Sequence, residues 1–339
     1  MRKFAVAKKN HLHTAAAEKI FGLVKSELKM VESEYRDQAS SNIQVIDYLG
    51  DYLQSSGGKR VRPALLILAN YGVGGNGKQE NVIRLATVME MLHTATLVHD
   101  DIIDNAYLRR NRPSVNARFG NQTAVLMGDW LYMSAFEAAL RERSLRILDI
   151  LTRLTRKMTE GELLQLTTLG RSDVSEDDYF DILKRKTAYL FSACCEIGAI
   201  LGDADDNIVS ALRDFGMNLG IAFQLADDLL DFTSDESVLG KAAGSDLTEG
   251  KMTLAPILLR LSSPGLTNEI RKVMLDGNYE RYPRSQLINV LEKNGVIDTV
   301  RGRAYEYAAA ARKNLEVLPQ TGYGEALGDL PAFVIERNR

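Results

Sequence analysis

Two short groups of aspartates are the residues of this sequence best suited to chemistry. Each group has two adjacent aspartates and a third four residues after the first: Asp100, Asp101 and Asp104, and then Asp227, Asp228 and Asp231. If the surrounding apolar segments are helical, the first and third aspartates of a group share one face, about 6 Å apart along the axis. Like charges at that spacing destabilise a helix by about 0.2–0.5 kcal/mol per pair, so we expect a bound cation to compensate them.

The repetition of the pattern favours a metal site over a solvated acidic helix end, which would explain a single group equally well. Unpartnered carboxylates in an apolar helix are costly. Oxygen ligands suit hard cations, and Mg²⁺ usually binds through one or two carboxylates together with substrate phosphates. Neither His nor Cys completes the two sets, which argues against zinc. We therefore expect Mg²⁺ ions whose remaining ligands are diphosphate oxygens and water.

Three basic segments can supply the positive charge that a diphosphate needs from the protein. They are GGKRVRP at 57–63, LRRNRPS at 108–114 and GKAAGSDLTEGK at 240–251. Arginine side chains match phosphate oxygens in a bidentate manner, and the glycine spacing of the third segment is typical of a lid. Such runs are usually solvated surface when they occur singly. Next to paired acidic groups they indicate a site for an anion together with metal ions.

The elements that position these residues are predicted to be helices. Strand patterns are almost absent, and no strand followed by GxGxxG is present, which argues against a dinucleotide-binding fold. The chain has only 7 prolines in 339 residues, and neither a fixed repeat nor a linker divides it. We expect helices over residues 14–36, 41–54, 63–71, 80–104, 120–141, 144–170, 176–202, 205–233, 250–262, 284–293 and 295–316.

The composition is that of an ordinary globular protein, with 45% hydrophobic and 26% charged residues. A net charge of −3 leaves no basic field for a nucleic acid, and no apolar run reaches the roughly 18 residues of a membrane span. The adjacent cysteines Cys194 and Cys195 cannot join distant segments, which favours a reduced, cytoplasmic setting. Glycines four residues apart, at 198 and 202 and at 216 and 220, indicate close packing of helices.

The segments GGKRVRP, HDDIID with the following LRR, QLADDLLDF, GKAAGSDLTEGK and FVIERNR occur in an order that resembles the trans-isoprenyl (polyprenyl) diphosphate synthase family. The resemblance implies one polyprenyl synthase domain over residues 1–339, with residues 1–13 as a loose leader. It implies an all-α, isoprenoid synthase-like helical bundle around a central apolar cavity, usually as a homodimer. It also implies a Mg²⁺-dependent prenyltransferase that joins isopentenyl diphosphate head to tail (1'-4) to an allylic diphosphate such as farnesyl or geranylgeranyl diphosphate.

The family's motifs assign roles to residues of this chain by position. Both aspartate groups would hold the magnesium ions, with Asp100 and Asp104 as the direct ligands of the first. Isopentenyl diphosphate would be bound by Lys59, Arg62, His93 and Arg110. The allylic substrate would be surrounded by Arg109, Lys186, Thr187, Gln224, Lys241 and Lys251. The groups expected to act catalytically at the leaving pyrophosphate are Asp100, Asp101, Asp104, Lys186, Asp227 and Lys241. Asn111 stands where the family commonly has glycine.

The resemblance also bears on product length. Short-chain members typically carry Phe or Tyr where this chain has Ala95 and Thr96, so a long all-trans product, with octaprenyl as the central value, is implied. An ideal helix places Ala95 about 140° from Asp100, so periodicity alone does not single it out. Trp130, with Tyr132 and Phe136, is a candidate to close the channel, although ordinary core packing accounts for these rings too.

Other functions remain as alternatives. A shorter-chain geranylgeranyl or farnesyl diphosphate synthase keeps the same motifs, and a non-catalytic subunit of a heteromeric prenyl synthase would have lost its aspartates. A terpene cyclase would not need the second set of basic residues. A di-iron bundle would need two Glu-x-x-His motifs, and Glu90 with His93 supplies one. The protein is expected in the cytoplasm, with peripheral membrane association through its product.

Overall fold

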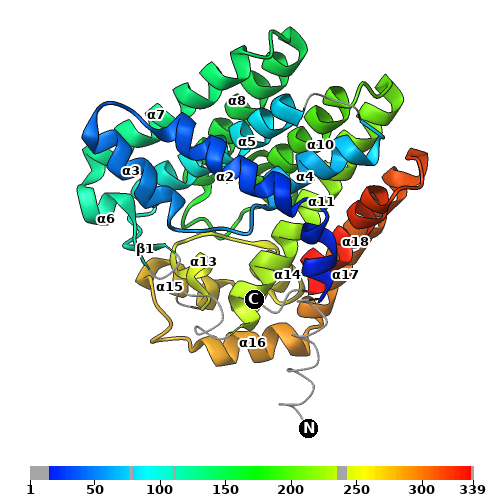
Figure 1. The fold of residues 1–339 in the computed structure, drawn as a ribbon. Helices are drawn as coiled ribbons and strands as arrows, with labels where there is room; N and C mark the ends of the chain where they lie inside the picture. The colour runs from blue at the N-terminus through cyan, green and yellow to red at the C-terminus, as the bar shows by residue number, and fades with distance from the viewer. Residues whose placement is uncertain (1–14, 76–78, 110–111, 235–242, 337–339) are drawn as a thin grey trace.

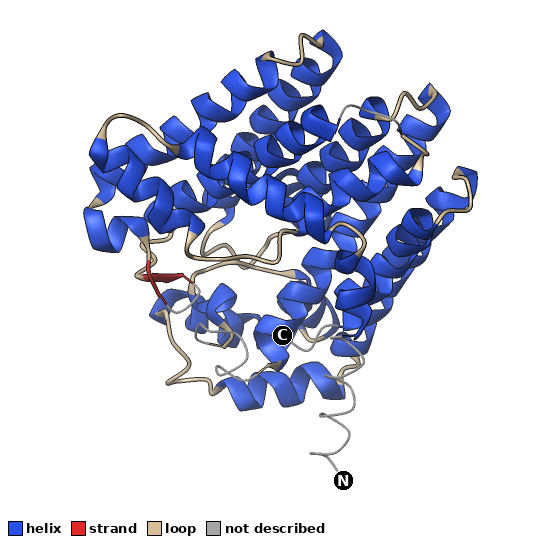
Figure 2. Cartoon of the chain, viewed as in Figure 1, coloured by secondary structure: helices blue, strands red, loops and turns tan. Residues whose placement is uncertain are grey.

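The computed structural model describes residues 15–75, 79–109, 112–234 and 243–336. These residues are almost entirely helical (Figure 2), and their only strands are the two-residue β1 (Leu108–Arg109) and β2 (Arg112–Pro113), which pair antiparallel. The all-α prediction is confirmed. The expected leader at residues 1–13 lies outside the described residues. Among the described helices, none combines the length and hydropathy that crossing a bilayer requires.

The N-terminal two thirds of the chain forms a large helical group (Figure 1). Its helices are α2 (Lys25–Ala39), α3 (Gln44–Gln54), α4 (Val61–Gly72), α5 (Gln79–Ile103), α6 (Val115–Phe119), α7 (Asn121–Leu140), α8 (Leu145–Thr168), α9 (Glu176–Leu183) and α10 (Tyr189–Leu201). A π-helical turn, η1 (Lys184–Ala188), joins α9 to α10. Helix α5 lies at the centre because it packs against α2, α4, α7 and α10, and an apolar surface on most of its sides matches that position.

A smaller group of helices lies beside the first and is reached through the long helix α11 (Asp206–Thr233). The elements that follow are α13 (Ser245–Thr248), α14 (Leu254–Ser262), η2 (Pro264–Leu266), α15 (Thr267–Asp276), α16 (Arg284–Lys293), α17 (Val296–Asn314), η3 (Leu315–Val317) and α18 (Gly322–Glu336). Figure 1 shows α13–α16 below the larger group, with α11 running between the two. The first half of α11 packs into one hydrophobic cluster and its second half into another. Burial of both halves therefore fixes the position of its C-terminal end.

Glycines allow two pairs of helices to approach closely, as their spacing indicates. A Cβ added at Gly198 of α10 would lie 2.4 Å from the backbone oxygen of Leu66 on α4, and one at Gly216 of α11 would lie 2.5 Å from the oxygen of Phe191 on α10. Such distances leave no room for a methyl group. The packing interpretation of these glycines is confirmed.

The helix predictions differ from the structure in several places. The predicted helix over 176–202 contains the π-helical turn, and the one over 250–262 begins only at Leu254. Helices α15 and α18 are missing from the prediction, as are the short helices α6 and α13. The sequence of α18 carries Gly322 at its start and Pro331 inside it, and both residues are poor helix formers whose cost is offset here by burial of its apolar face.

Replacing Gly198 with alanine tests the close approach of α10 and α4. We expect the free energy of unfolding in urea to fall by about 1–3 kcal/mol, because the added methyl group overpacks a backbone contact. Gly302 on α17 is the matched control, since a Cβ there meets nothing within 4 Å. Gly302→Ala should leave stability unchanged or raise it by up to about 1 kcal/mol. Equal effects of the two substitutions would contradict the packing described here.

Candidate active site

The first aspartate group lies at the C-terminal end of α5 and its three side chains have different surroundings. Asp101 is buried and accepts a forked ion pair from Arg109 on β1, with Nε 2.8 and 2.9 Å from its two oxygens and Nη2 2.6 Å from Oδ1. Asp104 lies at the surface and Asp100 is half-buried. The Asp101–Arg109 pair fixes the end of α5 against the hairpin, which leaves Asp100 and Asp104 as the two carboxylates not committed to it.

Asp100 lies in a crowd of negative charge. Burial raises its pKa to about 7, and the neighbouring carboxylates of Glu162 and Asp104 act in the same direction, while Lys186 and Arg109 oppose them. An ordinary aspartate is ionised well below neutral pH. Lys186 and Arg109 thus leave the pKa of this carboxyl raised, and a cation bound beside it would lower that pKa.

The second aspartate group lies in the last turns of α11. Asp228 is buried and accepts hydrogen bonds from Tyr179 Oη at 2.6 Å and Gln224 Nε2 at 2.7 Å. Burial raises its pKa to about 7, helped by Asp246 and opposed by both hydrogen bonds. Asp231 accepts a hydrogen bond from the backbone N–H of Asp246 at 3.2 Å, which ties α11 to α13. Asp227 is the exposed member of the group.

Two hydrogen bonds link elements near the two aspartate groups. Lys251, just after α13, donates to Asp104 Oδ2 at 3.2 Å across 147 residues of sequence, and it also lies in the field of Asp246. On the other side, Thr187 Oγ1 donates to Gln224 Oε1 at 2.9 Å. The first connection joins α5 to the segment around α13, and the second joins the π-helical turn to α11.

The π-helical turn η1 directs two adjacent side chains toward different partners. Lys186 forms an ion pair with Glu162 Oε1 at 2.7 Å and donates to Gln165 Oε1 at 2.9 Å on α8, while Thr187 faces α11. Gly161 makes room for the turn, because a Cβ there would lie 3.1 Å from the backbone nitrogen of Lys186. π-Helical turns occur frequently at functional sites, and this one sets Lys186 beside Asp100.

Sequence reasoning missed several polar residues of this site. They are Glu162 and Gln165 on α8, Tyr179 on α9 and Asp246 on α13. The spacing of Glu162 and Gln165 places them on one helix face, which is the signal that was available. Polar residues at that spacing also occur on any solvated helix, so their part in the site needed the structure.

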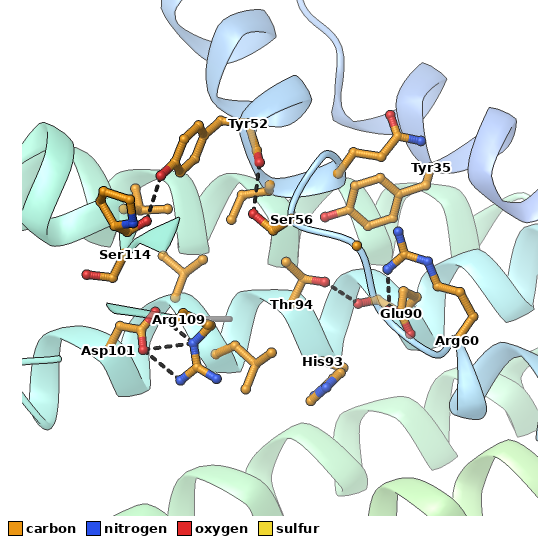
Figure 3. A pocket seen from close by; sticks show the side chains of 17 residues that line it. Tyr35, Tyr52, Ser56, Arg60, Glu90, His93, Thr94, Asp101, Arg109 and Ser114 are labelled. Atoms are coloured by element: carbon orange, nitrogen blue, oxygen red, sulfur yellow. Dashed lines mark hydrogen bonds and ion pairs between the residues drawn. The ribbon is translucent and has the colours of Figure 1, made fainter. Parts of the chain in front are cut away.

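The basic segment between α3 and α4 lines a small cavity of about 40 Å³ beside α5. Figure 3 shows this cavity, with Arg60, Glu90 and His93 at one end and Asp101 with Arg109 at the other. Arg62 lies nearby, its guanidinium 5.2 Å from the centre of the Phe191 ring. The wall of the cavity thus runs from the basic segment to the first aspartate group.

The structure places the other predicted residues as follows. Arg110 and Lys241 lie outside the described residues, as does Asn111. Ala95 is fully buried on α5, and Thr96 Oγ1 donates to the backbone oxygen of His93 at 2.7 Å. Lys59 is exposed in its segment.

The three aromatic residues of α7 are partly buried against the main hydrophobic cluster. Tyr132 stacks on His99 with a centroid distance of 5.9 Å, and burial, with Asp100 and Glu162, raises its pKa to about 12. Its ring therefore lies close to the first aspartate group. The indole N–H of Trp130 is buried and has no hydrogen-bond partner among the described residues. A deep channel closed by these rings stays a prediction.

The donor atoms fit a cation that shares its ligands with substrate. Among the described residues, no three His, Cys, Asp or Glu side chains lie close enough to hold a metal ion by themselves. That arrangement does not suit a closed structural zinc site. Glu90, the candidate for a di-iron site, is instead paired with Arg60. Oxygen ligands from carboxylates on α5 and α11 suit Mg²⁺, which keeps several coordination positions for phosphate and water.

Comparison with known proteins agrees with this geometry. A family model described as polyprenyl synthetase matches residues 43–288. The chain is 37% identical to octaprenyl diphosphate synthase of Escherichia coli (strain K12), over 95% of this chain and 99% of that protein. It is 38% identical to all-trans-nonaprenyl-diphosphate synthase (geranyl-diphosphate specific) of Rhodobacter capsulatus, over 88% and 91% of the two chains.

Solved structures show the same fold. The crystal structure of a polyprenyl synthase from Caulobacter crescentus CB15, complexed with calcium and isoprenyl diphosphate, superposes with a TM-score of 0.89 at 34% identity, covering 95% of this chain and 98% of that one. The motif order, the family match and the shared fold lead to one conclusion: the chain belongs to the polyprenyl synthetase family.

Proposed function

We propose that this chain is a Mg²⁺-dependent prenyltransferase that extends an allylic diphosphate with isopentenyl diphosphate, head to tail (1'-4), to a long all-trans polyprenyl diphosphate. Two series of contacts carry the proposal. Lys251 donates to Asp104 and lies in the field of Asp246, whose backbone N–H donates to Asp231. Lys186 acts on Asp100, and the adjacent Thr187 donates to Gln224, which donates to Asp228. Octaprenyl is the central value for the product, which agrees with the octaprenyl and nonaprenyl synthases among its relatives.

The contacts of the aspartates divide their roles. Asp100 and Asp104 on α5 and Asp227 on α11 are the proposed ligands of Mg²⁺, which stabilises the negative charge of the departing pyrophosphate when bound. Asp101 has both oxygens engaged by Arg109, and Asp228 both oxygens engaged by Tyr179 and Gln224. We therefore assign Asp101 and Asp228 to positioning rather than to direct ligation.

Charged side chains of the protein complete the allylic site. Lys186 and Lys251 lie beside the first aspartate group and supply positive charge to a bound diphosphate. Thr187 holds Gln224 through its hydroxyl, and Gln224 holds Asp228. The barrier of the reaction lies in separating an allylic cation from an anionic leaving group, and preplaced positive charges lower such a barrier.

Isopentenyl diphosphate is assigned to the basic segment at 57–63 and the neighbouring turn of α5. Lys59, Arg62 and His93 would bind its phosphates, since the segment and α5 line the same cavity next to the first aspartate group (Figure 3). This second anion site favours chain elongation over cyclisation of a single diphosphate.

Two further features of the proposal concern assembly and setting. Leu126, Met133 and Leu140 are exposed and seven residues apart on α7, so they form a stripe along one face of the helix. We propose that this stripe packs against a second copy of the chain, as exposed apolar surface of this kind marks interaction sites.

The proposal places one domain of residues 1–339 in the cytoplasm, where the free cysteines Cys194 and Cys195 stay reduced.

The enzyme assay tests the reaction directly. The purified chain incubated with farnesyl diphosphate, isopentenyl diphosphate and Mg²⁺ should release pyrophosphate and form polyprenyl diphosphates near C40, measured by mass spectrometry. Chelation of the metal should abolish turnover.

Asp104→Asn and Asp227→Asn should each lower kcat by about 100-fold or more, whereas Asp298→Asn, on the exposed face of α17, should not. Formation of a cyclic hydrocarbon without isopentenyl diphosphate consumption would refute elongation, and turnover only after adding a second protein would indicate a non-catalytic subunit.

Ala95→Tyr tests the implied channel. If the growing chain passes this position, the larger side chain should shift the products to shorter lengths while turnover continues. Ala86 is also fully buried on α5, so Ala86→Tyr controls for overpacking of the helix. An unchanged product distribution, or the same shift in both variants, would refute the assignment of Ala95.

Met133→Glu tests the proposed self-association. A charge in the middle of the α7 stripe should convert a dimer to a monomer in sedimentation-velocity experiments, because burial of an unpaired carboxylate is costly. Glu306→Gln, at an exposed position of α17, should leave the assembly state unchanged. A wild-type protein that sediments as a monomer at micromolar concentration would contradict the proposal.

A further inference from the structure

A buried ion pair joins the basic segment before α4 to the middle of α5. Arg60 Nη1 lies 2.6 Å from Glu90 Oε1, and the two side chains are only 10% and 7% exposed. Arg60 Nε also lies 3.4 Å from the more exposed Glu32 of α2. Neither Arg60 nor Glu90 has a role in the site described so far. Because desolvation offsets much of the attraction in a buried pair, its presence is weak evidence for a role in stability.

The backbone at Arg60 adds a second observation. Arg60 is the residue before α4 and has a left-handed conformation, with φ 50° and ψ 36°. Residues with a side chain adopt this conformation uncommonly. The turn at Arg60 separates Lys59 from Arg62. The directions of these two basic side chains therefore depend on the backbone at Arg60, which the buried Arg60 guanidinium holds in place through its pair with Glu90.

The partner of Arg60 lies next to a third predicted ligand. Glu90 precedes His93 by three residues on α5, so the two side chains are neighbours on the helix surface. Figure 3 shows Arg60, Glu90 and His93 together at one end of the cavity, with Tyr35 opposite. The ion pair therefore fixes the basic segment relative to the helix that carries both His93 and the first aspartate group.

We propose that the Arg60–Glu90 ion pair is a positioning device for isopentenyl diphosphate. The ion pair fixes the distance between the basic segment and α5. At that distance Lys59, Arg62 and His93 converge on one diphosphate group. Arg60 and Glu90 act through these three residues. The inference rests on the proposed function, since it requires that Lys59, Arg62 and His93 bind isopentenyl diphosphate.

Steady-state kinetics of two substitutions test the proposal. Glu90→Gln keeps the size of the side chain and removes its charge, and Arg60→Lys keeps a charge but loses the planar fork. Each should raise KM for isopentenyl diphosphate about 10-fold, as loss of a group that orients a ligand typically does. KM for farnesyl diphosphate should change less than about 2-fold in both variants. Measuring the second variant keeps the test valid if one of the two fails to fold.

The same helix provides a matched control for stability. Arg84 of α5 forms an ion pair with Glu142, with side chains 11% and 3% exposed. Glu142→Gln should lower Tm to a similar extent as Glu90→Gln and leave KM for isopentenyl diphosphate unchanged. An equal rise in this KM for both variants would show a general loss of stability and overturn the proposal. If Glu90→Gln raises the KM for isopentenyl diphosphate and the KM for farnesyl diphosphate equally, the proposal is also overturned.

A third comparison separates this inference from the function on which it rests. Lys59→Met and Arg62→Met remove proposed ligands directly and should raise KM for isopentenyl diphosphate by more than Glu90→Gln does. If they leave it unchanged, the assignment of the isopentenyl site is wrong. If they raise it while Glu90→Gln and Arg60→Lys do not, the site stands and the positioning role of the ion pair is overturned.

Discussion

The arrangement of the candidate site depends on carboxylates gathered at the C-terminal ends of α5 and α11. Burial alone raises the pKa values of Asp100 and Asp228, and neighbouring acids raise them further, so that both reach about 7. Lys186 and Lys251 compensate part of this charge. A protein that gathers carboxylates in this way needs additional positive charge to keep them ionised, and under the proposed function a divalent ion shared with a diphosphate would supply it.

The scaffold serves to hold these like charges in place. Helix α11 is anchored in two hydrophobic clusters, one on each half, so its acidic end cannot move without disrupting one of them. The forked pair of Arg109 with Asp101 fixes the end of α5. The backbone bond from Asp246 fixes Asp231 at the end of α11. Apolar burial thus offsets the repulsion that the site creates.

Much of this could be predicted because the informative residues repeat. Two aspartate groups in apolar segments predict helices and a metal, and the segments between them predict where the positive charge lies. The different roles of neighbouring aspartates could not be predicted, since Asp100 and Asp101 are the same residue type and only the position of Arg109 distinguishes them. The π-helical turn at Lys184–Ala188 also has no sequence pattern, because its geometry depends on the space that Gly161 leaves on α8. Helix periodicity likewise does not single out Ala95 as a position that affects product length.

The central claim is that both aspartate groups hold metal ions bound to one diphosphate. A crystal structure with Mn²⁺ and a non-reactive thio-analogue of farnesyl diphosphate, phased to show the anomalous signal of manganese, tests it most directly. We expect manganese peaks next to Asp100 and Asp104 and next to Asp227, with the analogue's diphosphate bridging them. Peaks confined to one aspartate group, or a diphosphate bound away from both, would contradict the account.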